Sequence, residues 1–149
     1  MTKGDKAKQL FESGYNCAQA VFCSFPEITG LDNETALRVS AGLGGGMGRM
    51  REVCGAVSGM IMVLSAKYAC TDPSNHEEKA ALYALIQKAA EEFRAENGSI
   101  ICRELLGLGE KKSDPNPEVR TQTYYKKRPC GELVKCAADI TEKYIQQKN

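Results

Sequence analysis

Apolar residues recur every three or four positions along much of the chain, which predicts a protein built from α-helices. The clearest helix lies between residues 74 and 98, where the apolar positions are Leu82, Leu85, Ile86, Ala89 and Phe93. Ser74 and Asn75 precede Glu77 and Glu78 at the spacing of a capping box, and Gly98 is a typical stop residue. We therefore expect one long amphipathic helix across this segment.

The segment from Cys54 to Tyr68 is apolar on nearly every side, which is typical of a helix at the centre of a bundle. We expect the core to include the side chains of Val57, Met60, Ile61 and Leu64. The longest uncharged run, residues 53–66, has 14 residues, whereas a membrane-spanning helix needs about 20 apolar ones. Membrane insertion is therefore not expected.

Shorter helices are expected on either side of this centre. Two of them meet at residues 14–16, and Asp32 is an N-cap candidate for a third. Ser99 is a cap candidate for a short helix that carries Cys102, and residues 111–128 have the character of a loop with a weak strand pattern over Val119–Tyr125. A last helix carries Leu133, Ala137, Ile140 and Tyr144. The whole pattern predicts one compact all-α domain, residues 1–149, folded as a bundle of about five to seven helices.

The balance of charge limits the partners of this chain. Its 20 basic and 19 acidic residues leave a net charge of +1, so no overall field attracts nucleic acid or an anionic membrane. We expect no nucleic-acid partner, and a redox partner or a small molecule of unknown identity fits better. The charged N-terminal residues have no apolar stretch behind them, unlike an export signal. A cytoplasmic location is therefore expected.

Cysteine is the residue type that points to chemistry. Seven cysteines in 149 residues are many for the reducing cytosol, where such residues usually bind metal or take part in catalysis. The odd number argues against a framework of paired disulfides. No Cys-x-x-Cys occurs, which excludes thioredoxin motifs, zinc ribbons and ferredoxin-type runs.

Four cysteines share one local setting, because each stands in or near the first turn of an expected helix. They are Cys17, Cys54, Cys102 and Cys130. First-turn amides lack partners within the helix and the helix dipole is positive there, so a thiol pKa should fall below its usual value of about 8.5. Thiolates are nucleophiles and metal ligands. We therefore select these four as redox thiols in a metal-free protein, or as the ligands of a metal or cofactor.

Basic residues precede two of these cysteines and should lower their pKa further. Arg49 and Arg51 stand before Cys54, and the Lys-Lys-Arg run of residues 126–128 stands before Cys130. Structural roles are expected for the other three cysteines, Cys23, Cys70 and Cys136. Two of those three lie six positions beyond a selected cysteine, about 240° around a helix and off its face.

The glycine cluster between residues 42 and 48 is expected to bring the backbone close to the Cys54 thiol or to another helix. No lysine follows it as in a phosphate-binding loop, and no Gly-x-Gly-x-x-Gly register fits. Gly55 and Gly59 offer a second smooth surface on the central helix. The helix that packs there belongs either to the same chain or to a second copy, so a homodimer is one option.

At these residues the sequence resembles the redox-active protein family named for its cysteine pattern, C_GCAxxG_C_C. Cys17 matches the first cysteine, and residues 54–59, Cys-Gly-Ala-Val-Ser-Gly, match a CGAxxG core after a glycine-rich lead. Cys102 and Cys130 match the last two cysteines, so the resemblance covers nearly the whole chain. It implies redox activity through cysteine and an association with transporter genes. Related segments in some multi-cofactor cytochromes imply an iron–sulfur cluster.

Three functions stay open at this point, and the residues do not decide whether the protein is an enzyme. In the first, the four cysteines bind an iron–sulfur cluster or a single iron or zinc ion, in an electron carrier or sensor. In the second, no cofactor is bound and pairs of cysteines cycle between dithiol and disulfide. In the third, the chain is a metal-trafficking or adaptor protein of a membrane transporter. Both redox hypotheses require the four sulfurs to share one pocket, roofed by residues 44–48.

Overall fold

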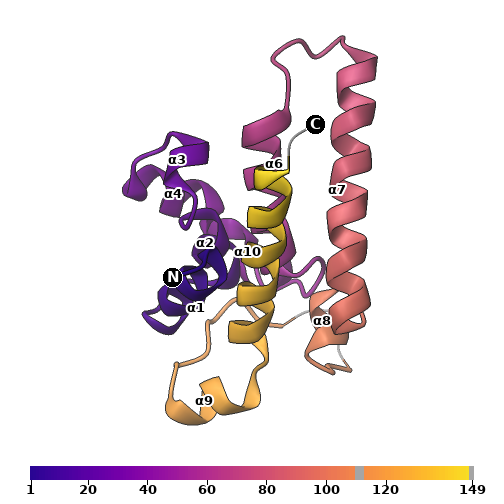
Figure 1. Cartoon of the computed structure of the whole chain (residues 1–149). Coiled ribbons are helices and arrows are strands. Elements are labelled where there is room, and N and C mark those ends of the chain that lie inside the picture. Colours follow the sequence, from indigo (N-terminus) through magenta and orange to yellow (C-terminus); the bar gives the residue numbers. More distant parts are fainter. Residues whose placement is uncertain (110–112, 148–149) are drawn as a thin grey trace.

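The computed structural model describes residues 1–109 and 113–147, apart from the side chains of residues 126 and 127, and it is all-α (Figure 1). The predicted fold class is confirmed. The longer helices are α1 (Lys3–Glu12), α2 (Cys17–Phe22), α4 (Asn33–Ser40), α6 (Gly55–Tyr68), α7 (His76–Asn97), α9 (Gln122–Lys127) and α10 (Cys130–Gln146). Single turns are α3 (Pro26–Thr29), η1 (Ala41–Leu43), α5 (Gly44–Met47) and α8 (Cys102–Leu105). Within the described ranges the helices outnumber the five to seven expected, because a single turn is too short to leave a periodic pattern.

Side-chain caps explain where the main helices begin. The Asn16 side chain accepts a hydrogen bond from the Gln19 amide, and the Gln19 side chain accepts one from the Asn16 amide, so a capping box starts α2. Asp32 caps α4, as expected, and Asn75 caps α7. Gly98 ends α7 with a left-handed φ of 91°.

Helix α6 forms the centre of the molecule, with α2 packed on one side and α10 on another (Figure 1). Val57, Met60 and Leu64 are fully buried, as expected. The expectation was wrong for Ile61, which is only partly buried because the neighbouring helices cover α6 incompletely. The long helix α7 buries only Ala89 and Phe93. Among the described residues, no helix combines the length and the apolar content needed to cross a bilayer.

Two glycines allow α2 and α6 to lie in close contact. A Cβ atom on Gly59 would stand 2.9 Å from the Ala18 carbonyl oxygen, and one on Gly55 would stand 3.1 Å from the Cys17 Cβ atom. The smooth surface predicted on the central helix is therefore filled by a helix of the same chain. These glycines do not provide the homodimer contact that the sequence left open.

The segment 119–125 is not a strand, and the expected loop over residues 111–128 contains helix α9. Residues 111 and 112 of that loop lie outside the described residues. The Thr121 side chain caps α9 by accepting a hydrogen bond from the Tyr124 amide. Tyr125 packs edge-on against Phe11, with 5.8 Å between ring centroids. Capping and packing thus outweigh the β-propensity of Val, Thr and Tyr in this segment.

Substitution of Gly59 by alanine should destabilise the fold by about 1–3 kcal/mol, because the added methyl group overpacks the contact between α2 and α6. Chemical denaturation followed by circular dichroism measures this difference. Gly42→Ala is the matched control, since a Cβ atom at Gly42 meets nothing within 4 Å. Equal free energies of unfolding for the two variants would contradict the close approach.

Candidate functional site

The four selected cysteines stand at the starts of four helices. Cys17, Cys102 and Cys130 are the first residues of α2, α8 and α10, and Cys54 is the N-cap residue of α6. These placements agree with the sequence analysis. All seven cysteines of the chain are thiols without a disulfide bond.

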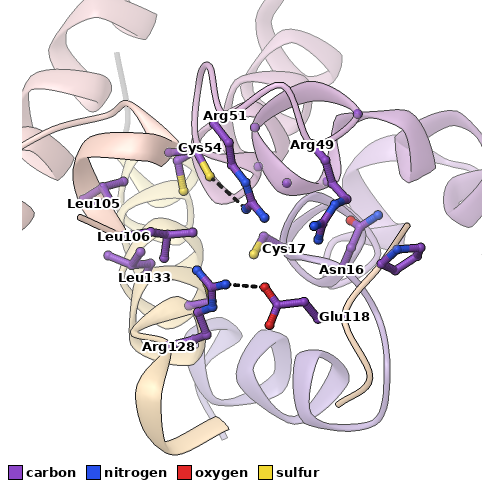
Figure 2. Close-up of a pocket in the computed structure, with 18 of the residues that line it drawn as sticks. Asn16, Cys17, Arg49, Arg51, Cys54, Leu105, Leu106, Glu118, Arg128 and Leu133 are labelled. Carbon is purple, nitrogen blue, oxygen red and sulfur yellow. Dashed lines mark hydrogen bonds and ion pairs between the residues drawn. The ribbon is translucent and has the colours of Figure 1, made fainter. Parts of the chain in front are cut away.

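All four of these cysteines line one cavity of about 420 Å³ (Figure 2). The sulfurs come from segments as far apart as the first and last parts of the chain, and Figure 2 shows Cys17 and Cys54 beside the same space. Cys54, Cys102 and Cys130 are buried, whereas Cys17 is partly exposed. Cys23, Cys70 and Cys136 are not among the residues that line this cavity.

Backbone pairing brings Cys54 and Cys102 together. Val53 and Ile101 form an isolated antiparallel bridge. The Cys54 amide donates to the Ile100 carbonyl at 2.8 Å, and the Cys102 amide donates to the Glu52 carbonyl at 2.6 Å. These two bonds join the start of α6 to the start of α8, a contact that no periodic pattern in the sequence indicates.

The glycine-rich turn lines the cavity and lies against Cys102, at the start of α8, which agrees with the expected close approach to another helix. A Cβ atom on Gly46 would stand 2.6 Å from the Cys102 Cβ atom, and Gly46 has a left-handed φ of 68°. The residues that follow continue this unusual path, with φ of 63° at Arg49 and 60° at Arg51. Such values are uncommon for residues with side chains and are found mostly where function or tight packing imposes them.

Four arginines line the same cavity, namely Arg49, Arg51, Arg120 and Arg128. Arg51 is only 5% exposed, and its Nη1 lies 3.5 Å from the Cys102 sulfur. Arg128 pairs with Glu118, and Arg120 donates to the Phe11 carbonyl at 2.7 Å. The sequence analysis missed Arg120, because it stands ten positions before Cys130 and no local pattern connects the two.

Cys17 and Cys130 line the same cavity, and each shifts the pKa of the other, in opposite directions. The hydrogen bond from Cys17 lowers the pKa of Cys130, and the nearby charges of Arg128, Arg51 and Arg120 lower it further against the effect of burial. The same hydrogen bond to Cys130, together with burial, raises the pKa of Cys17. As the pH rises, Cys130 therefore ionises before Cys17.

The expectation that all four thiols would have low pKa values was wrong for Cys17 and Cys54. Burial raises the pKa of Cys54 to about 12, although the nearby amides of Val57 and Ala56 act to lower it. The cost of removing a charge from water thus exceeds the favourable effect of a helix start. Burial also raises the pKa of Cys136 to about 12 and that of Cys23.

Comparison with known proteins gives one match. The model of a family described as "Putative redox-active protein (C_GCAxxG_C_C)" matches residues 15–144. The chain belongs to this family. The resemblance noted in the sequence is thereby confirmed, and the four cysteines on which it was based line the cavity. Neither the curated proteins nor the solved structures include a match to this chain.

In this C_GCAxxG_C_C protein, alkylation of Cys130 should begin at a lower pH than alkylation of Cys54, because only the thiolate reacts. Replacing Cys17 by alanine removes the hydrogen-bond donor and should move the midpoint for Cys130 upward by about one pH unit. Cys17→Ser keeps a donor and is the matched control. Mass spectrometry of iodoacetamide-labelled peptides across a pH series measures both midpoints, and no movement in Cys17→Ala would contradict the paired arrangement.

Proposed function

We propose that this protein is a thiol–disulfide redox protein that works through Cys130 and Cys17. The observation that carries the proposal is that Cys17 and Cys130 line one cavity and shift each other's pKa in opposite directions. A dithiol centre needs one ionised sulfur that attacks and a second sulfur within reach that stays protonated until it is used. Cys130 has the lowered pKa that suits the attacking sulfur, and Cys17 has the raised pKa that suits the sulfur used second.

The proposed reaction is an exchange of disulfide bonds in two steps. Cys130 attacks one sulfur of a partner disulfide, so that a mixed disulfide forms and one partner thiolate leaves. Cys17 then attacks the Cys130 sulfur, and its proton passes to the second partner sulfur as that sulfur leaves. The partner gains two electrons and becomes one thiolate, which can take a proton from water, and one thiol, while the protein keeps a Cys17–Cys130 disulfide.

The surroundings of the pair support this chemistry. Arg128, Arg51 and Arg120 supply positive charge that favours a thiolate at Cys130. The cavity that both residues line gives a small partner a route to the pair. Cys54 is held neutral by burial at ordinary pH, so it does not compete as the first nucleophile.

An iron–sulfur cluster is the second candidate, and the lining of one cavity by all four cysteines favours it. The donor set fits, because four thiolates are the usual ligands of such clusters and nearby arginines offset their negative charge. The residues that would hold it are Cys17, Cys54, Cys102 and Cys130, and the bound cluster would supply one-electron transfer. A single iron or zinc ion is less well matched, since within the described ranges no three Cys, His, Asp or Glu side chains are arranged to hold one.

Mild oxidation of the metal-free protein should give a Cys17–Cys130 disulfide that a dithiol reductant reverses. Peptide mapping without reduction, followed by mass spectrometry, identifies the linked residues. Cys17→Ser and Cys130→Ser should each abolish the link, whereas Cys23→Ser, a buried cysteine outside the cavity, should leave it unchanged. A different pairing, or none, would contradict the proposed function.

Purification without oxygen distinguishes the two candidates. A cluster protein should be coloured, contain iron and sulfide, and lose both when any one of the four cavity cysteines becomes serine. The thiol protein should be colourless and iron-free under the same conditions, with Cys136→Ser as the control in both cases. Retention of iron by all four single variants would count against a four-cysteine cluster.

A further inference from the structure

The cavity carries more positive charge than its own residues neutralise. Its lining includes four arginines and one carboxylate, Glu118, which pairs with Arg128. Among the described residues, no carboxylate lies within ion-pair distance of Arg49, Arg51 or Arg120. Even a thiolate at Cys130 leaves positive charge in the cavity.

The hydrogen-bond partners of these arginines in the described residues include no carboxylate. Arg51 donates to the Ser113 hydroxyl at 2.9 Å and to the Cys102 sulfur, and Arg49 donates to the Asp114 backbone carbonyl at 2.7 Å. A charged side chain as buried as Arg51, which is 5% exposed, is costly without a carboxylate beside it, and a bound anion offsets that cost. A negatively charged ligand in the cavity would therefore stabilise the charge of Arg51.

The backbone directs two of these guanidinium groups into the cavity at a conformational cost. Arg49 and Arg51 both have a left-handed φ, which non-glycine residues adopt rarely. Figure 2 shows their side chains extending from the glycine-rich turn toward Cys17, with Arg128 approaching from α9 on the opposite side. Strain of this kind persists where it positions functional groups.

One side of the cavity is lined by apolar side chains, which limits the chemistry of the ligand further. Leu105, Leu106 and Leu133 lie together on one side of the cavity in Figure 2, and Pro115 and Pro117 also line it. The volume of about 420 Å³ falls within the range of small-molecule sites, about 300–1,000 Å³. A small inorganic anion would contact the arginines but leave the leucines without a partner. The ligand should therefore combine an apolar body with negative groups.

We propose that this cavity binds a low-molecular-weight disulfide that carries carboxylate groups, as the substrate of the Cys17–Cys130 pair. Arginine binds carboxylate through paired, charge-assisted hydrogen bonds, and the leucine wall contacts the body of the molecule. This inference rests on the proposed function. One substrate sulfur bonds to Cys130 as the other leaves as a thiolate, and the attack of Cys17 then releases the first sulfur as a thiol. The substrate is reduced by two electrons and the cysteine pair is oxidised.

A pair of chromogenic probes tests this substrate class in single-turnover reactions of the reduced protein. Bis(carboxynitrophenyl) disulfide carries two carboxylates, whereas dipyridyl disulfide is uncharged at neutral pH. We divide the ratio of their rate constants with the protein by the ratio of their rate constants with a small neutral thiol. This normalisation corrects for the intrinsic reactivity of each probe. We expect this normalised ratio to favour the carboxylate probe by about tenfold.

Arg49→Gln should reduce the normalised ratio by about two- to threefold, because it removes one of the three guanidinium groups that have no carboxylate partner among the described residues. Arg38→Gln is the matched control, since Arg38 is exposed on α4 outside the cavity and the charge change is identical. Added salt should also lower the ratio of the unmodified protein, which tests the charge without any substitution.

The possible results separate this inference from the proposed function. A ratio near one in the unmodified protein, with the Cys17–Cys130 disulfide formed by both probes, would overturn the anionic substrate and leave the proposed function in place. Equal ratios for Arg49→Gln and Arg38→Gln would likewise overturn the anionic substrate alone. Failure of both probes to produce the Cys17–Cys130 disulfide would overturn the proposed function and, with it, this inference.

Discussion

The close packing of α2 on α6 is the contact on which the rest of the site depends. Gly55 and Gly59 let the two backbones approach to a distance that a methyl group would prevent. Cys17 starts one of these helices and Cys54 caps the other, so the contact places two of the four sulfurs at the same end of the bundle. The two glycines of the CGAxxG core thus have a structural purpose that does not involve chemistry.

Two opposing electrostatic effects give the cysteines of this site different pKa values. Helix starts and arginines favour thiolates, whereas burial favours neutral thiols. The amides of Val57 and Ala56 favour a thiolate at Cys54, yet its almost complete burial raises its pKa to about 12. Cys130 is also buried, but a donor thiol and three arginines surround it, and its pKa falls. One site therefore offers sulfurs of contrasting reactivity.

The helices and the four cysteines at their starts were predictable because the signals are local. Asn16, Asp32 and Asn75 each sit next to the helix they cap, and the apolar pattern of α7 repeats over many turns. The bonds between residues 52–54 and residues 100–102 were not predictable, since a single bridge leaves no periodic pattern. The position of Arg120 in the cavity and the raised pKa of Cys54 both result from tertiary packing, which local sequence patterns do not reveal.

The location of Cys17 and Cys130 near opposite ends of the chain has a mechanical consequence. A covalent bond between them would close a loop of more than 100 residues. In the entropic model, such a loop lowers the entropy of the unfolded chain and so raises the free energy of unfolding by about 4–5 kcal/mol. Because α1 packs on α10, such a bond would also fasten together the two terminal segments of the molecule. The oxidation state of one thiol pair would then set how readily the whole chain unfolds and how long it survives a protease.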